Sequence, residues 1–362
     1  MLYKELGLVP LRVSALGVGS SSFRDLVPQD GCRILERAYD MGVNYYDTAI
    51  SYKNGEASFS LLPEEKNKSF IIATKTGHRG GKGCIKDLQD SLNSLRRQYI
   101  DVWMTHMIQT KEDYDQCVSL GGFCDIATAA KKAGLVRAYG ASFHGSTQLI
   151  ERVLSDRAFE VVMFQFNLIC RETVIGSSIE SYRKYLLPLA QKSGTGIIAM
   201  KVLAGGEMSF GAPGLAGFMG ENDPIAASLR FACLSPTIHS AVVGVKSEEE
   251  LIQDINAVDG IYECNAEKFE EWAAEIGRHF SGECTRCGIC ISSCPEKISI
   301  PQIFRLIDQY RFFAMRDVAK WKYQKYSENA RRCSHCMECS SICPNGIDIA
   351  EGLKAADSLL GS

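Results

Sequence analysis

Short apolar runs alternate with longer amphipathic stretches between residues 13 and 258. The apolar runs are rich in Val, Ile and aromatic residues, and several are apolar on both faces. Parallel strands that helices cover on both sides have this composition. The predicted strands are VSALGVG (13–19), NYYDTA (44–49), SFIIATKT (69–76), DVWMTHM (101–107), VRAYGAS (136–142), VVMFQFNL (161–168), GIIAMKVL (196–203) and SAVVGV (240–245).

Helical patterns fill the gaps between these strands, for example in CIKDLQDSLNSLRRQ, STQLIERVLSD and IESYRKYLLPLAQKSG. Eight strand–helix units in about 250 residues are typical of a (β/α)8 TIM barrel, so we predict an α/β fold of this type. A doubly wound parallel sheet is the alternative. It is disfavoured because no G-x-G-x-x-G follows the first predicted strand.

The character of the chain changes after residue 259. One amphipathic helix, NAEKFEEWAAEIGRHF, is followed by a cysteine run, a mixed segment and a second cysteine run. We therefore predict two domains. Residues 1–262 form the barrel, and residues 263–362 form a C-terminal domain that is helical at first and then a ferredoxin-like α+β iron–sulfur domain.

The two cysteine runs, CTRCGICISSCP (284–295) and CSHCMECSSICP (333–344), share the spacing C-x2-C-x2-C-x3-C-P. Thiolates suit iron–sulfur clusters, and in two-cluster ferredoxins the fourth cysteine of a run ligates the other cluster. Zinc is the alternative, but structural zinc sites use separate C-x2-C pairs. The segment resembles bacterial two-cluster ferredoxins. The pattern predicts one 4Fe–4S cluster on Cys284, Cys287, Cys290 and Cys343, and a second on Cys333, Cys336, Cys339 and Cys294.

Composition limits the environment of the protein. The chain of 362 residues has a net charge of −3 and a pI near 6.1, so we expect no nucleic-acid or anionic-membrane partner. No signal peptide is evident in MLYKELGLVPLRV, and no apolar run approaches the ~20 residues of a membrane span. We expect a cytoplasmic protein.

Fifteen cysteines are many for a chain without an export signal, which indicates a reducing and, we expect, anaerobic host. Eight of the fifteen lie in the two runs. We predict that the others are buried thiols without a chemical role. They are Cys32, Cys84, Cys117, Cys124, Cys170, Cys233 and Cys264.

Polar residues lie at or near the ends of three successive predicted strands. Asp47 and Tyr52 lie in NYYDTAISYKNGE, Lys75 in FIIATKTG and His106 in DVWMTHM. Each alone is a weak signal, since a Tyr or His near a strand end is more often a packing residue. Together they lie on the barrel face where catalysis occurs.

These residue types indicate acid catalysis at a carbonyl group. A free tyrosine has a pKa near 10, and a neighbouring ammonium from Lys75 lowers that pKa by favouring the phenolate. Asp47 would keep Lys75 charged and fixed, and His106 would orient the substrate oxygen. Tyr52 would then donate a proton to a carbonyl oxygen or accept one from an alcohol.

Residues 1–258 resemble aldo-keto reductases. The segments LRVSALGVG, NYYDTAISYKNGE, FIIATKTG, DVWMTH, YGAS, GIIAMKVLAGG and AVVGVKSEEEL occur in the order of that family, and the full chain resembles its iron–sulfur branch. The resemblance implies a (β/α)8 barrel, NADP(H) or sometimes NAD(H), and an Asp–Tyr–Lys–His tetrad that matches the four residues above. It also indicates candidate cofactor-binding residues, which are Ser142, Gln165, Lys201, Gly244, Lys246 and Ser247.

The cofactor positions depart from the family pattern. Phe143 follows Ser142 where the family commonly has Asn, and Met163 stands where it has Gln, with Gln165 two residues on and on the same face. Met200 replaces an aromatic residue that usually stacks on nicotinamide. Glu250 and Asp254 stand where the family often has Arg or Gln and Asn. Carboxylates repel a 2′-phosphate, which favours NADH over NADPH and leaves loss of nicotinamide binding open.

Lys201 has two interpretations. It is a candidate cation for a phosphate or an acidic substrate, or it is a solvated or ion-paired lysine.

Three functions are compatible with these patterns. The first is an oxidoreductase that interconverts a small carbonyl compound and an alcohol, with two clusters that are structural or pass electrons to a redox protein. The second is an electron-transfer module whose clusters work with a partner protein. The third is a non-redox lyase or isomerase that uses the same tetrad. The intact tetrad argues against the second.

Overall fold

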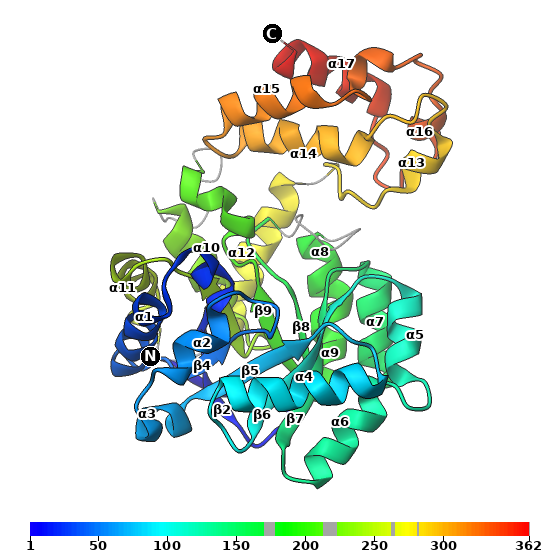
Figure 1. Ribbon diagram of the computed structural model, residues 1–362. Coiled ribbons are helices and arrows are strands. Elements are labelled where there is room, and N and C mark those ends of the chain that lie inside the picture. Colours follow the sequence, from blue (N-terminus) through cyan, green and yellow to red (C-terminus); the bar gives the residue numbers. More distant parts are fainter. Residues whose placement is uncertain (170–177, 213–222, 262–264, 281, 362) are drawn as a thin grey trace.

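The structure is a computed structural model that describes residues 1–362 apart from 170–177, 213–222, 262–264, 281 and 362. Helices surround a central barrel, and the helices near the C-terminus form a second lobe at one end of it (Figure 1). In the described residues, no helix combines the length and the apolar character that crossing a membrane requires.

The barrel consists of eight parallel strands in the closed order β10-β3-β4-β5-β6-β7-β8-β9. All eight predicted strands are confirmed, and with them the TIM-barrel fold. The strands are β3 (Leu16–Gly19), β4 (Tyr45–Asp47), β5 (Ile71–Thr76), β6 (Ile100–Ile108), β7 (Val136–Phe143), β8 (Val161–Gln165), β9 (Gly196–Met200) and β10 (Ser240–Gly244).

An N-terminal hairpin closes the amino-terminal end of the barrel. It pairs β1 (Tyr3–Glu5) with β2 (Arg12–Ser14) in antiparallel fashion. Leu6 and Leu11 of this hairpin pack in one apolar cluster with side chains of the barrel interior, such as Met104. The first predicted strand is therefore split, since its first residues belong to β2, and the opposite end of the barrel remains open for a site.

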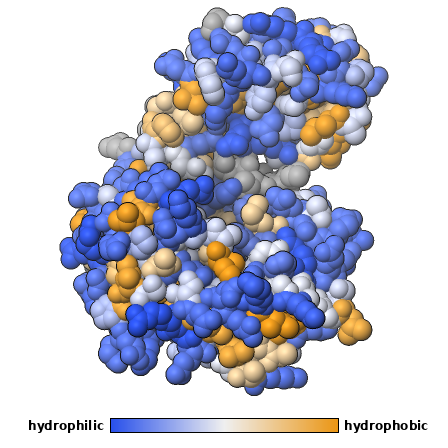
Figure 2. Space-filling view, in the orientation of Figure 1, coloured by the Kyte–Doolittle hydropathy of each residue, from blue (hydrophilic) through white to orange (hydrophobic). Residues whose placement is uncertain are grey.

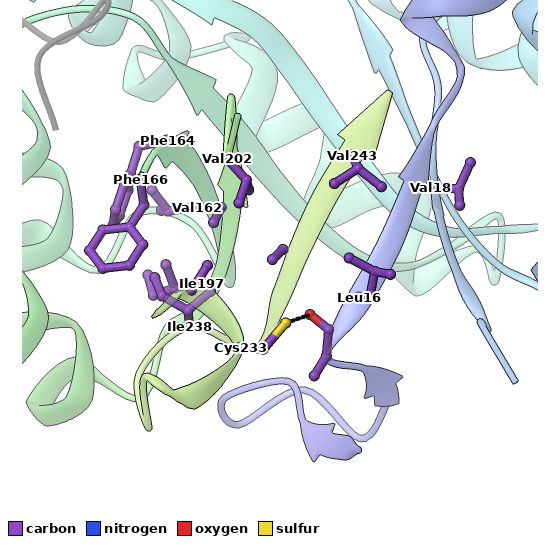
Figure 3. Close-up of a cluster of buried hydrophobic side chains, with 14 of the residues drawn as sticks. Leu16, Val18, Val162, Phe164, Phe166, Ile197, Val202, Cys233, Ile238 and Val243 are labelled. Atoms are coloured by element: carbon purple, nitrogen blue, oxygen red, sulfur yellow. Dashed lines mark hydrogen bonds between the residues drawn. The ribbon is translucent and has the colours of Figure 1, made fainter. Parts of the chain in front are cut away.

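Helices pack on the outer face of the strands, where alternate strand residues form the main core. Figure 3 shows Val162 and Phe164 of β8 in this cluster together with Leu16 and Val243. The helices are α1 (Pro28–Asp40), α2 (Gly55–Ser60), α3 (Glu64–Ser69), α4 (Gly81–Ser94), α5 (Lys111–Val118), α6 (Phe123–Lys132), α7 (Thr147–Asp156), α8 (Ile179–Ser181), α9 (Leu187–Ser193), α10 (Pro224–Leu234) and α11 (Glu248–Ala257). Shorter helical segments are η1 (Ser20–Asp25), η2 (Tyr182–Leu186) and η3 (Ala204–Phe210).

Helix α12 (Ala266–His279) packs on the barrel although it follows residue 262. Phe269 and Trp272 belong to the main core, and the Phe269 ring lies 5.1 Å from that of Phe231 in α10. The predicted boundary itself falls at residues 262–264, which lie outside the described ranges.

The second lobe has its own small core. The segments are α13 (Ile289–Ser293), α14 (Ile300–Arg311), α15 (Arg316–Lys325), η4 (Ala330–Arg332), α16 (Glu338–Ser341) and α17 (Ile349–Leu360). Ile303, Tyr323 and Leu353 pack together within it. The described residues after α12 contain helices and loops but no strand, so the expected α+β character is wrong. The insert between the cysteine runs forms the helices α14 and α15.

Candidate active site

The predicted tetrad comes together at the carboxyl-terminal end of the barrel. Asp47 ends β4, Lys75 lies in β5, His106 lies in β6, and Tyr52 lies in the turn before α2. All four side chains line one cavity of about 540 Å3. The strands supply three of the four groups directly, because neighbouring parallel strands end at the same edge of the barrel.

The turn that carries Tyr52 depends on a glycine. The Tyr52 N–H donates to the Ala49 carbonyl at 2.9 Å, and the Gly55 N–H donates to the Tyr52 carbonyl at 3.0 Å. A Cβ at Gly55 would lie 2.9 Å from the Ser20 and Thr48 hydroxyl oxygens and 3.0 Å from the Tyr52 Cβ. Only glycine therefore lets α2 begin close behind the tyrosine.

Lys75 and Asp47 form a buried ion pair under the tyrosine. The Lys75 Nζ lies 2.6 Å from Asp47 Oδ1 and also donates to the Thr48 carbonyl at 2.7 Å. The exposed fractions of the two side chains are 1% and 6%. Burial raises the pKa of Asp47, while the Lys75 ammonium opposes that change.

Tyr52 and His106 meet above this pair. The Tyr52 hydroxyl lies 3.4 Å from His106 Nε2, and the Lys75 ammonium lies 5.4 Å from the centre of the Tyr52 ring. The arrangement predicted for the tetrad is therefore present, with the ammonium beside the phenol and the imidazole in contact with its oxygen.

The expected net pKa of Tyr52 needs correction. Burial raises it above the ordinary value of 10, and this outweighs the lowering by the Lys75 ammonium and by Arg24. Sequence reasoning identified the charge that lowers the pKa but had no measure of burial. Tyr52 consequently holds its proton at neutral pH, which makes it a proton donor.

His106 is neutral in this pocket. Burial and the charge of Lys75 lower its pKa to about 3. The backbone at the end of β6 is fixed by Arg79, whose guanidinium donates to the carbonyls of His106 at 2.7 Å and Met107 at 2.9 Å. A neutral imidazole has one N–H to donate and one nitrogen to accept.

His144 and Arg24 also line the cavity, and the sequence analysis missed both. His144 follows β7, and burial together with Lys201 and Lys75 lowers its pKa to about 4. The available signal was strand alternation, because His144 lies two residues after Ser142 and so shares its side of the chain. No comparable signal marks Arg24, which lies in η1.

The predicted cofactor residues divide into two groups. Ser142, Lys201 and Gly244 line the cavity, and Ser142 Oγ accepts from the Met107 N–H at 2.9 Å. Gln165 is fully buried and is not among the lining residues, whereas Met163 is.

Lys246 and Ser247 lie beyond the cavity lining. The Ser247 hydroxyl caps α11 by accepting from the Glu250 N–H at 3.3 Å. The Lys246 N–H donates to the Glu250 carboxylate at 2.8 Å, so this carboxylate occupies the backbone donor beside the predicted phosphate site. Asp254 is buried, and burial with two nearby carboxylates raises its pKa to about 7.

The cavity offers groups that suit a bound dinucleotide. Among the described residues, the buried Asp47 Oδ2 has no hydrogen-bond partner, so it is available to a hydroxyl of a ligand. Gly205 and Gly206 also line the cavity, where their backbone allows close approach. Lys201 brings positive charge to the same wall. These features fit a polar, anionic ligand.

The cysteine runs surround two smaller cavities in the second lobe. The lining of one includes Cys284, Cys287, Cys290 and Cys343, and the lining of the other includes Cys294, Cys333, Cys336 and Cys339. Each cavity thus receives three cysteines from one run and the fourth from the other run. Three cysteines of one run with the fourth of the other are the ligand pattern of two-cluster ferredoxins, whereas structural zinc sites use separate C-x2-C pairs.

The backbone repeats between the two runs. Arg286 and His335, which precede the second cysteine of each run, both have left-handed conformations, with φ of 56° and 55°. Gly288 and Met337, which follow it, also match, with φ of 77° and 64°. The left-handed region is costly for Met337, so the repeated geometry indicates a functional constraint.

The remaining cysteines are mostly buried. Cys32, Cys84, Cys117 and Cys233 are buried and Cys124 is partly buried, while Cys170 and Cys264 lie outside the described residues. Burial raises the pKa of Cys84 and of Cys117 to about 11, which keeps both thiols protonated and unreactive.

Comparisons with known proteins agree with the two lobes. The pattern of the aldo/keto reductase family matches residues 15–211, and that of a 4Fe-4S dicluster domain matches residues 281–347. An uncharacterized oxidoreductase of Bacillus subtilis, YqkF, is 27% identical in an alignment of 185 residues that covers 47% of this chain and 58% of that protein. The chain thus matches little more than half the length of this curated relative.

Solved structures show the same barrel. The holo form of aldo-keto reductase AKR11C1 from Bacillus halodurans matches with a TM-score of 0.61 and 20% identity, over 76% of this chain and 96% of that one. Its apo form matches with a TM-score of 0.60 over the same shares. With the family pattern extending over more than half of the chain, this protein belongs to the aldo/keto reductase family and carries a C-terminal 4Fe-4S dicluster domain.

Proposed function

We propose that the barrel interconverts a small carbonyl compound and an alcohol, with Tyr52 as the group that transfers the proton. The observation that carries this proposal is the convergence of the four tetrad side chains in one cavity. The Tyr52 hydroxyl lies 3.4 Å from His106 Nε2 and beside the buried Lys75–Asp47 pair. A docking surface would not need this arrangement.

In the reduction direction, the carbonyl oxygen binds between Tyr52 and His106. The neutral imidazole orients that oxygen, and the phenol donates its proton as negative charge develops there. The Lys75 ammonium stabilises the phenolate that remains, and Asp47 holds the ammonium in place. Because burial raises the pKa of Tyr52, the phenol is fully protonated before the reaction.

A reduced nicotinamide would supply the hydride when bound. Ser142, Lys201 and Gly244 would hold the dinucleotide in the cavity, with Asp47 Oδ2 accepting from one of its hydroxyl groups. The Glu250 carboxylate, which accepts from the Lys246 N–H, favours NADH over NADPH. Gln165, Lys246 and Ser247 do not line this cavity, and Lys246 and Ser247 stay the proposed site for a 2′-phosphate outside it.

We further propose that the two cysteine sets ligate two 4Fe–4S clusters, each with three cysteines of one run and the fourth of the other. A hydride carries two electrons, whereas a 4Fe–4S cluster carries one. Coupling the two requires a flavin or a radical, and the sequence has no flavin signature. We therefore place the clusters outside each hydride step.

A second candidate function, electron transfer with a redox protein, has two observations in its favour. Four apolar side chains within the cysteine runs are 41–52% exposed, and Figure 2 shows some apolar surface on the upper lobe. They are Ile289, Ile291, Met337 and Ile342. Cys336 is itself exposed, so one cluster would lie near the surface.

Cluster-loaded protein that is purified without oxygen and mixed with NADH or NADPH and a broad panel of aldehydes and ketones provides the test. We expect oxidation of the dinucleotide with stoichiometric formation of an alcohol. Protein that binds neither dinucleotide and oxidises neither contradicts the proposal. Reduction of the clusters by a ferredoxin without such turnover favours the second candidate.

A further inference from the structure

The loop that follows β9 faces the cavity on one side and the dicluster domain on the other. Leu203, Gly205, Gly206 and Ser209 line the cavity. Between them, Glu207 is only 5% exposed and does not line the cavity.

Two side chains of α14 hold Glu207. Arg305 Nη2 donates to Glu207 Oε1 at 2.8 Å, and Gln309 Nε2 donates to the same oxygen at 2.5 Å. At the end of the loop, the Ala314 N–H donates to the Gly211 carbonyl at 3.0 Å. The dicluster domain therefore holds both the middle and the end of this loop.

The same helix also contacts the first cysteine run. Asp308 lies 2.7 Å from Arg286, and both side chains are 8% exposed. Arg286 lies between Cys284 and Cys287, and its N–H donates to the Cys284 sulfur at 3.4 Å. Phe304 of α14 lines the cavity of this cysteine set. Contacts thus run continuously from the first cysteine site through α14 to the cavity of the barrel.

The backbone of the loop needs such support. Ala204 has a φ of 51°, Gly205 of 65°, Gly206 of 92° and Gly211 of 89°. Left-handed conformations are disfavoured for Ala and cost a glycine its conformational freedom. Local preference therefore does not fix the shape of the loop, and contacts from outside must do so.

We propose that Glu207 is a positioning residue through which the dicluster domain holds the loop from 203 to 211 in the shape that binds the dinucleotide. This inference rests on the proposed function. Binding energies are reciprocal, so dinucleotide in the barrel must also stabilise the first cysteine site. The helix α14 carries the coupling, because it contacts both the loop and the cysteine run.

Glu207→Ala and Arg305→Met test the positioning role. We expect each to raise the Kd of the preferred dinucleotide, by about tenfold for Glu207→Ala, with kcat at saturation changed less than about threefold. Glu207→Gln, which keeps an oxygen for Gln309, should fall between this variant and the wild type. Arg152→Met is the control for Arg305→Met, because the Arg152 side chain is similarly exposed, 40% against 34%, and forms a 2.9 Å ion pair with Asp115 away from the loop. Its Kd should stay within about twofold of the wild type.

The cluster absorbance provides an independent readout. Dinucleotide should slow the bleaching of the wild-type clusters by a chelator and should not slow it in Glu207→Ala. If the variants keep their clusters and the Kd of the dinucleotide is unchanged, the inference is wrong while the proposed function stands. A wild-type protein that binds neither dinucleotide overturns both the inference and the proposed function. If Glu207→Ala does not fold, Arg305→Met decides, because Arg305 is partly exposed.

Discussion

In the barrel, the four tetrad residues come from three neighbouring strands and one turn, whereas in the dicluster domain each set of four cysteines comes from two short runs. The barrel brings distant residues together through its strand register, and its large apolar core holds them there. The dicluster domain relies on local turns and a much smaller core. The barrel should therefore keep its fold when the dinucleotide is removed, whereas the dicluster domain should depend on its clusters for folding.

Removal of the buried ammonium should have the largest effect in the barrel. We expect Lys75→Met to lower turnover by about a hundredfold or more, because the phenolate of Tyr52 loses its counter-charge. It should also lower the free energy of unfolding by about 3–5 kcal/mol, since Asp47 is left as an uncompensated buried charge. Steady-state kinetics and urea titration measure the two effects.

Lys66→Met is the control for this experiment. Lys66 pairs with Asp40 at 3.0 Å, but both side chains are partly exposed, so the cost should stay below about 1 kcal/mol. Equal losses of stability in the two variants would show that burial does not make the Lys75–Asp47 pair more important for folding than an exposed pair.

Double cysteine variants test which cysteines share a cluster in the dicluster domain. Cys294→Ser with Cys336→Ser removes two ligands of one proposed cluster, so about four of eight iron atoms should remain. Cys294→Ser with Cys287→Ser affects both clusters, and iron should fall towards zero. Iron analysis after anaerobic purification distinguishes the pairs. Equal iron contents in the two double variants contradict the crossed assignment, and Cys32→Ser should lose none.

The cysteine sites and the strands could be predicted from sequence because their signals are local. The apolar residues of β5 and β8 are consecutive rather than three or four residues apart, as a surface helix would have them. The cysteine spacing occurs twice. The tetrad followed from the rule that barrel strands end at one face.

Other features depend on contacts between distant parts of the chain. Glu207 and Arg305 are 98 residues apart, and no pattern marks them as partners. The net pKa of Tyr52 depends on burial, which the chain order does not reveal. Gln165 shares a strand face with Met163, but only Met163 lines the cavity. The long insert also hid the helical character of the second lobe, because α14 and α15 bury their apolar residues in a core shared with α17, which is distant in the sequence.

The pH profile tests the state of the histidine in the barrel. Because the pKa of His106 is lowered to about 3, its protonation should not reduce kcat/KM for carbonyl reduction between about pH 5 and 8. A loss of activity with an inflection near pH 6.5 that disappears in His106→Gln would contradict the neutral, buried imidazole.

The same shift has a consequence for stability. His106 and His239, with pKa values of about 3 and 4, bind protons less readily in the folded than in the unfolded protein. Their contribution to stability is complete above about pH 6.5 and is lost as the pH falls towards 3. Urea unfolding at several pH values measures this decline. A free energy of unfolding that rises as the pH falls from about 6.5 towards 3 contradicts it.

The smallest expected effect concerns dinucleotide choice. Glu250→Gln removes a carboxylate beside the predicted phosphate site, so the Kd for NADPH should fall by about two- to fivefold. The Kd for NADH should not change. Equal changes for both dinucleotides would show that Glu250 acts through the loop structure rather than through its charge.

Single-turnover reduction by Tyr52→Phe tests the central claim most directly. Anaerobic protein with intact clusters and bound reduced dinucleotide is mixed with a carbonyl substrate of the wild type, and dinucleotide oxidation is followed. We predict that the wild type oxidises its dinucleotide in one fast phase and that Tyr52→Phe is slower by about a hundredfold or more, with unchanged dinucleotide binding. Equal rates in the two proteins would contradict Tyr52 as the proton donor.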